Sequence, residues 1–146
     1  MQKFKFIYVL IISVGLSVMQ SNQSFCHTGH DHDAPKVIKA SKGGVIKSIK
    51  SLSSIVVEVV VKGSSVRIYT FDNNMTPLKL ADYTIEASAS APRSGKSDSV
   101  KLEAKDGYLA GNYNADGLHR YSLTINVTDL KSKKNGSVTF TIEPRK

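Results

Sequence analysis

The chain has 146 residues, of which 40% are hydrophobic and 22% are charged, and 20 basic residues against 12 acidic ones give a formal charge of +8. A single cysteine excludes an intrachain disulfide framework, so one hydrophobic core must hold the fold. The basic residues are scattered instead of forming an arginine-rich helix or a stripe interleaved with aromatic residues, and this distribution argues against nucleic-acid binding.

The first 26 residues have the layout of a secretory signal peptide. Lys3 and Lys5 supply a positive start, an apolar run over residues 6–16 follows, and residues 20–24 are polar. The apolar run is shorter than the roughly 20 residues that span a bilayer. The pattern therefore indicates export and not a membrane anchor, and we expect no transmembrane segment in the mature chain.

The cleavage site decides what becomes of the cysteine. Signal peptidases prefer small residues one and three positions before the cut. Cleavage after Cys26 fits this rule through Ser24 and Cys26 itself, and it would leave His27 as the mature N-terminus. Cleavage after Ser24 is the alternative, and it would leave a free thiol near the new terminus. Acylation of Cys26 as a lipoprotein fits less well, because Gln23 and Phe25 stand where leucine and a small residue are preferred.

A cluster of imidazole and carboxylate side chains follows the expected cleavage site. It has the sequence His27-Thr-Gly-His30-Asp31-His32-Asp33. Histidine-rich tracts with neighbouring carboxylates are candidate metal sites. We predict that the three histidines ligate one ion and that the two aspartates add oxygen ligands or orient the imidazole rings.

The type of ligand limits the choice of metal. Nitrogen and oxygen donors without a thiolate suit Cu(II), Ni(II) or Zn(II), and the Irving–Williams order makes Cu(II) the tightest. We expect copper or zinc and no organic cofactor. If cleavage follows Cys26, the α-amine and the imidazole of His27 form a bidentate chelate. Binding should weaken below about pH 6.5 as the imidazoles protonate. The alternative is a soluble leader whose histidines bind metal incidentally.

The amino-acid pattern of the mature chain changes after residue 43. Residues 27–43 contain several lysines and little hydrophobic patterning, and we predict a flexible arm. We expect a sandwich domain over residues 44–146. Its first half predicts a short strand over residues 45–47, a nearly all-apolar strand over residues 55–61, and a third strand over residues 66–71. The composition of the second is typical of a strand buried on both faces or lying centrally in a sheet.

The second half alternates apolar and polar residues with the period of two that half-exposed strands show. It predicts strands over residues 83–90, 100–105, 108–113, 121–127 and 138–142. Asp106-Gly107 and Asn135-Gly136 are hairpin signals, and we expect the second to form the turn into the last strand.

These patterns predict an all-β fold. We count about seven or eight strands, with a turn every ten residues or so and no convincing helical stripe. This combination is typical of an antiparallel β-sandwich with immunoglobulin-like architecture. The chain has no tryptophan, so the Cys…Trp…Cys pattern of antibody domains is absent. The sequence therefore predicts the architecture and leaves the strand order open.

Two polar residues stand out within the predicted strands. His119 shares parity with Tyr121 and Leu123, so we expect it near the inward face as a packed residue and not as a ligand. Glu58 lies amid valines and should be a structurally paired or edge-facing charge. The sequence contains no zincin, nucleophile-elbow or phosphate-loop motif, and we predict that the protein is not an enzyme.

Several of these segments follow one another in a familiar order. After the His-x-Gly-His-Asp-His-Asp cluster come Gly43-Gly44, Val-Glu-Val-Val within residues 55–61, Ile-Tyr-Thr-Phe-Asp ending at Asp72, and Phe140-Thr-Ile142. In this order the chain resembles small periplasmic β-domains that occur alone, or fused ahead of periplasmic adaptor subunits, in bacterial heavy-metal efflux systems. The resemblance implies a Gram-negative periplasmic protein associated with copper, zinc or cobalt handling. We expect no adaptor hairpin or barrel after residue 146, so the resemblance implies a soluble accessory or metal carrier.

The sequence therefore predicts a periplasmic, non-enzymatic β-sandwich whose arm captures copper or zinc for tolerance or delivery. The alternative is an interaction module, in which an exposed strand edge binds a protein partner such as an efflux adaptor and the arm is incidental. An enzyme would need a pocket that holds His119 beside an acid.

Overall fold

The computed structural model describes residues 38–52, 54–115 and 117–144, all within the second of two compact units, Lys36–Lys146. The strands of this part are β1 (Val45–Ser48), β2 (Val56–Lys62), β3 (Ser65–Phe71), β4 (Tyr83–Ser90), β5 (Asp98–Val100), β6 (Leu102–Lys105), β7 (Tyr108–Asn112), β8 (Tyr121–Asp129) and β9 (Asn135–Ile142). A single turn of 3-10 helix, η1 (Leu80–Asp82), precedes β4. Within these ranges no helix is long and apolar enough to cross a membrane.

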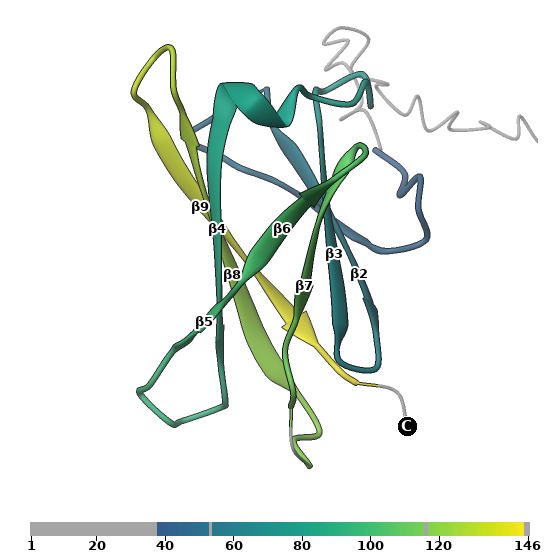
Figure 1. Ribbon diagram of the computed structural model, residues 1–146, viewed down its shortest axis with the longest axis vertical. Coiled ribbons are helices and arrows are strands. Elements are labelled where there is room, and N and C mark those ends of the chain that lie inside the picture. Colours follow the sequence, from purple (N-terminus) through teal and green to yellow (C-terminus); the bar gives the residue numbers. More distant parts are fainter. Residues whose placement is uncertain (1–37, 53, 116, 145–146) are drawn as a thin grey trace, which may run out of the picture. The chain divides into compact units, whose positions relative to one another are not determined.

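The strands form two antiparallel sheets, as predicted. One sheet has the order β1-β2-β3-β7-β6 and the other the order β5-β4-β8-β9. Figure 1 shows β2, β3 and β7 on one side and β4, β8 and β9 on the other. The strands can be given immunoglobulin letters in chain order, with β2 as A, β3 as B, β4 as C, β5 as C′, and β6 to β9 as D to G. The two sheets then have the orders A-B-E-D and C′-C-F-G. This is the arrangement of an immunoglobulin sandwich, and β1 is an additional strand beyond A.

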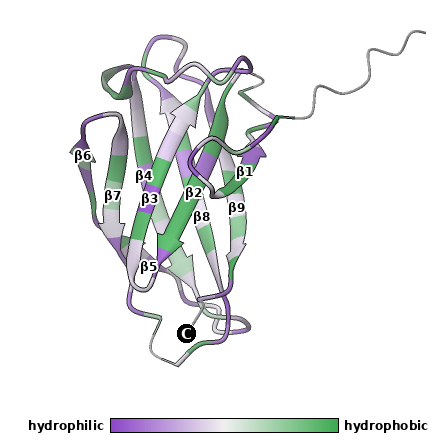
Figure 2. Cartoon of the chain, turned by 90° about the vertical axis from the view of Figure 1, so that its right-hand side faces the viewer, coloured by the Kyte–Doolittle hydropathy of each residue, from purple (hydrophilic) through white to green (hydrophobic). Residues whose placement is uncertain are grey.

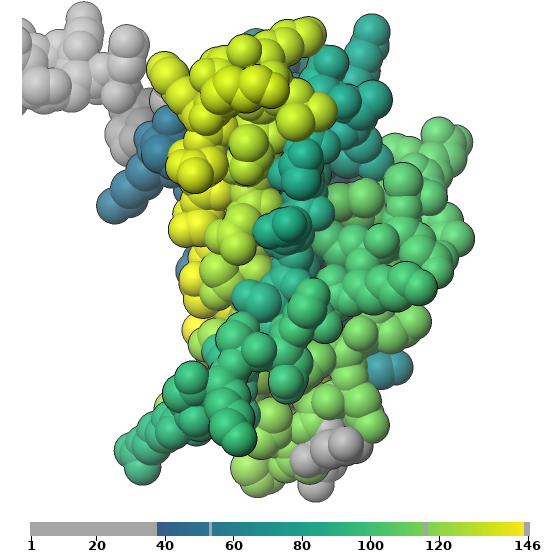
Figure 3. All heavy atoms as spheres, turned by 60° about the vertical axis from the view of Figure 1, so that its left-hand side comes forward, coloured from purple at the N-terminus to yellow at the C-terminus, as the bar shows by residue number. Residues whose placement is uncertain are grey.

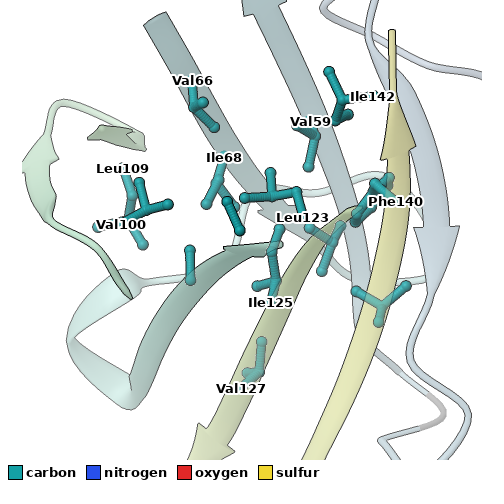
Figure 4. Packing of buried hydrophobic residues seen from close by; sticks show 14 of the residues in the cluster. Val59, Val66, Ile68, Val100, Leu109, Leu123, Ile125, Val127, Phe140 and Ile142 are labelled. Carbon is teal, nitrogen blue, oxygen red and sulfur yellow. The ribbon is translucent and has the colours of Figure 1, made fainter. Parts of the chain in front are cut away.

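The core lies between the two sheets and contains the inward-facing residues of both. β8 shows why the sequence folds this way, because its alternate residues are buried and the residues between them are not. The buried members are Tyr121, Leu123, Ile125 and Val127. Figure 4 shows residues of β8 and β9 meeting Val59, Val66 and Ile68 from the opposite sheet. Each such aliphatic side chain gains about 1.5–3 kcal/mol on leaving water, so this layer is the main source of stability.

The described part of the chain has nine strands where the sequence predicted seven or eight, because the run over residues 100–105 changes sheets. Its beginning belongs to β5, which pairs with β4, and its remainder is β6, which pairs with β7. Lys101 stands at the crossing. Gly111 in β7 leaves room for it, since a Cβ there would lie 2.9 Å from Leu102 Cδ2 and 3.0 Å from the carbonyl oxygen of Lys101.

The last hairpin does not turn at Asn135-Gly136, so that prediction is wrong. The turn uses residues 130–134, and Asn135 and Gly136 are the first residues of β9. Gly136 instead permits a close approach, because a Cβ there would overlap Ser51 Oγ and Ile49 Cγ2. The glycine therefore reflects the loop that packs against β9 and not the geometry of a turn.

The outer faces of the two sheets differ in chemistry. On the four-stranded sheet, which comes forward in Figure 3, most outward positions carry a hydroxyl or an amide. They are Thr84, Ser88, Ser90, Ser99, Ser122, Thr124, Asn126, Thr128, Asn135, Ser137, Thr139 and Thr141. The outer face of the five-stranded sheet, which is turned to the viewer in Figure 2, carries charged and aromatic residues instead.

Candidate functional site

The five predicted metal ligands lie outside the described residues. They are His27, His30, Asp31, His32 and Asp33. The expected signal peptide over residues 1–26 lies outside them as well. The metal site and the export signal therefore stay predictions from the sequence.

The remaining histidine is exposed, which corrects the expectation that it faces inward. His119 lies in a bend before the start of β8. The alternation that buries Tyr121 and Leu123 applies only where the strand is paired, so it does not extend back to this residue. Over residues 38–52, 54–115 and 117–144, no three side chains of His, Cys, Asp and Glu gather closely enough to hold a metal ion.

A buried carboxylate in β2 is held by a cage of hydrogen-bond donors. The side chain of Glu58 is 0% exposed. Its Oε1 accepts the backbone N–H groups of Lys42 at 2.7 Å and of Gly44 at 2.9 Å. Its Oε2 accepts the backbone N–H of Ser41 at 2.8 Å and the hydroxyl of Ser41 at 3.2 Å. These bonds fasten the segment before β1 to the outer face of β2.

The cage also sets the ionisation of this carboxylate. Burial alone raises the pKa of Glu58, but the donors from Gly44, Ser41 and Lys42 outweigh it, so the pKa lies below the ordinary value of 4.5. The group is therefore charged at neutral pH. Gly44 is required for the close approach, because a Cβ there would lie 2.7 Å from the carbonyl carbon of Val59.

Two tyrosines and two cations meet on the same outer face. The ring centroids of Tyr69 in β3 and Tyr108 in β7 are 5.3 Å apart, with the rings tilted by 32°. Lys42 Nζ lies 5.8 Å from the Tyr69 centroid, and the guanidinium carbon of Arg67 lies 5.7 Å from the Tyr108 centroid. Both rings are half-buried and both cations are exposed. These four residues are termed the tyrosine face.

Sequence reasoning missed the tyrosine face because its members come from three separate segments. Arg67 and Tyr69 alternate on β3, and this spacing does place them on one side of the strand. Tyr108 joins them because β7 is inserted beside β3. Lys42 joins them because Glu58 holds its backbone. The cluster could have been found only from the order of the strands in the five-stranded sheet.

The side of the sandwich between β1 and β9 is closed by side chains. Lys47 Nζ donates a hydrogen bond to the carbonyl oxygen of Thr139 at 2.7 Å and lies 5.6 Å from the ring centroid of Phe140. Ser51 Oγ donates to the carbonyl oxygen of Asn135 at 3.0 Å. Two carbonyl groups on the free edge of β9 are thus already bonded, which is a common protection of edge strands. A groove of about 700 Å³ lies beyond them, between the ends of β2 and β9.

A shallow polar hollow of about 400 Å³ lies on the outer face of the four-stranded sheet. Glu86, Ser88 and Asn126 line it together with Ser99 and Lys101. These groups can hydrogen-bond a polar molecule. Its lining residues include no histidine or cysteine, and their hydroxyl, amide, carboxylate and ammonium groups form a hydrogen-bonding surface.

Comparison of the chain with protein-family models, with curated proteins and with solved structures finds no match. The resemblance to efflux-associated periplasmic domains therefore stays a prediction from the sequence. Function has to be argued from the residues of this chain, because a sandwich of this kind serves many unrelated functions.

Proposed function

We propose that this chain is an exported, non-enzymatic β-sandwich whose residues 27–33 capture a divalent transition metal, copper or zinc, as an accessory in metal tolerance or efflux. The observation that carries the proposal is the gathering of three imidazoles and two carboxylates within seven consecutive residues. The periplasmic location rests on the signal-like residues 1–26.

The chemistry of these residues supports a borderline metal ion. Imidazole nitrogen suits copper, nickel and zinc, whereas sites built from oxygen alone suit magnesium and calcium. The spacing of His27, His30 and His32 places three imidazoles within reach of one ion in several backbone conformations. Asp31 and Asp33 would supply oxygen ligands or accept hydrogen bonds from the rings. Because the ligand is the neutral imidazole, the ion should be released as pH falls below about 6.5.

The segment that follows the candidate ligands in the sequence is bonded to the sandwich. Glu58 binds the backbone of Ser41, which stands eight positions after Asp33 in the sequence. The candidate ligands therefore precede, in the sequence, a segment that is hydrogen-bonded to the folded domain.

Isothermal titration of the signal-processed protein with Cu(II), Zn(II) and Ni(II) tests the proposal, with the N-terminus established by intact mass. We expect stoichiometric, sub-micromolar binding that disappears in a His27→Ala/His30→Ala/His32→Ala variant. His119→Ala is the matched control, because this histidine is exposed and outside the cluster, and it should bind as the wild type does. Weak binding, or binding equal in the triple variant, would contradict the proposal.

An interaction module without a specific metal role is the second candidate. The outer edge of β9, which is eight residues long, favours it, because an edge strand can accept a partner strand once Lys47 and Ser51 release the two carbonyl groups that they bind. Deletion of residues 27–34 separates the two functions. Loss of metal binding and of metal tolerance supports metal capture. Tolerance retained together with binding to a periplasmic partner supports the module.

A further inference from the structure

We propose that the tyrosine face is an interaction surface for an acidic segment of a partner protein. The proposal is independent of metal capture, since it uses Lys42, Arg67, Tyr69 and Tyr108 and none of residues 27–33. It also differs from strand addition, because it places the partner across the five-stranded sheet and not along an edge.

The composition of the tyrosine face is that of an interface centre. Tyrosine and arginine are enriched among the residues that contribute most to protein–protein binding. Tyrosine offers a large rigid surface with few rotatable bonds, so little conformational entropy is lost on binding. Val60 and Ala110 stand opposite Arg67 in the strand register, on β2 and β7, and both are half-buried. They extend the apolar surface next to the guanidinium.

The charge of the tyrosine face selects an acidic partner. The ion pairs of the described residues join Lys105 to Glu103 and Lys131 to Asp82, and neither includes Lys42 or Arg67. Glu58 pairs in register with Tyr69, but its carboxylate is buried among backbone donors. Carboxylates of a partner would therefore meet two exposed cations, and complementary charge of this kind raises association rates and fixes the register of an interface.

The four residues are already positioned for contact. Tyr69 lies beside two other rings, because its centroid is 6.5 Å from that of Phe71 on the same strand and 5.3 Å from that of Tyr108 on β7. Lys42 and Arg67 rest over aromatic rings, a contact worth about 0.5–1 kcal/mol at exposed sites. Side chains that are ordered before binding lose less entropy when a partner arrives.

A protein partner fits this surface better than a lipid membrane does. Recognition of anionic lipid uses clusters of about four to eight lysines and arginines. The tyrosine face has two such cations, each over a half-buried ring. Few charges beside rigid aromatic rings are typical of a specific contact with one peptide segment.

Selection of peptides from a display library tests the proposal. Random peptides of about twelve residues are selected on the signal-processed chain, and their affinities are measured by fluorescence anisotropy, with changes in amide chemical shift to locate the contact. We expect the recovered peptides to be rich in aspartate and glutamate and to shift amides of β3 and β7. Arg67→Gln should weaken them by about fivefold or more, which corresponds to about 1 kcal/mol.

Arg120→Gln is the matched control, because Arg120 is an exposed arginine just before β8, and it should change affinity less than about twofold. Tyr108→Leu tests the ring separately and should also weaken binding. Recovered peptides without acidic enrichment, or shifts confined to β4 and β8, would overturn the proposal. Binding to vesicles of phosphatidylglycerol and phosphatidylcholine is measured for the same variant. If Arg67→Gln loses vesicle binding and keeps peptide binding, the proposal is overturned in favour of a lipid surface.

Discussion

At the residue scale, Glu58 joins β2 to the segment that precedes β1 through four hydrogen bonds. Each hydrogen bond to a charged group contributes about 1.5–3 kcal/mol, although such contributions do not simply add. The position of a lone glutamate among valines indicated a structurally paired or edge-facing charge, whereas the structure shows a carboxylate in a central strand that is bound by backbone and hydroxyl donors. Its donors could not be predicted, because they come from residues 14 to 17 positions earlier in the chain.

Replacement of this carboxylate should destabilise the fold. We expect Glu58→Gln to lower the free energy of unfolding by about 2–4 kcal/mol, because an amide has one acceptor oxygen and turns its own N–H groups toward backbone donors. Urea unfolding at neutral pH measures the effect. The control is Glu86→Gln on the exposed face of β4, which should change the free energy by less than about 0.5 kcal/mol. Equal effects of the two substitutions would contradict this account of the cage.

The same carboxylate should make stability depend on pH. The pKa of Glu58 is lowered in the folded state, so its contribution is complete above the unfolded pKa of about 4.5 and is lost as pH falls through the folded value. Between neutral pH and about pH 3, the wild type should therefore lose more unfolding free energy than Glu58→Gln does. Parallel losses in the two proteins would show that Glu58 titrates alike in both states.

At the element scale, strand edges and the strand that changes sheets decide how the sandwich closes. The alternation of apolar residues predicted most strands correctly, because each sheet has one buried and one exposed face. It could not reveal the crossing at Lys101, since the alternation runs unbroken from Val100 to Leu102. The prediction of a turn at Asn135-Gly136 was wrong for a different reason. The glycine is required for the packing of a distant loop and not for a turn.

The crossing should be sensitive to substitution at Gly111. A Cβ there would press on Leu102 and on the Lys101 carbonyl oxygen, so Gly111→Ala should cost about 1–3 kcal/mol of unfolding free energy through overpacking. Asn112→Ala, at the next and exposed position of β7, should cost less than about 0.5 kcal/mol. Thermal and urea unfolding of both variants measure the difference, and a neutral Gly111→Ala would show that the crossing strand can move aside.

The edge of β9 should depend on Lys47 for protection. Lys47→Thr removes the bond to the Thr139 carbonyl and a charge from this edge, and we expect self-association in a concentration series followed by sedimentation velocity. Lys50→Thr is the matched control, because this lysine lines the same side of the sandwich. A monomeric Lys47→Thr at every concentration would show that other features protect β9.

At the scale of the whole molecule, the chain combines a sandwich with two unlike outer faces and a candidate metal segment. The fold class could be predicted because turn residues and the period of two repeat along residues 44–146. The strand order could not, since it depends on which edges meet. The chemistry of residues 27–33 was visible in the sequence because ligands within one short segment need no folding to become neighbours, whereas the tyrosine face required the order β2-β3-β7.

The central claim, that residues 27–33 bind a metal on an exported domain, is tested most directly by native mass spectrometry of the protein recovered from the periplasm after exposure to one equivalent of Cu(II) or Zn(II). The account predicts a chain that begins at His27 or Phe25 and carries one ion, with the ion absent from the His27→Ala/His30→Ala/His32→Ala variant. A metal-free chain, or an ion that the triple variant retains, would contradict it.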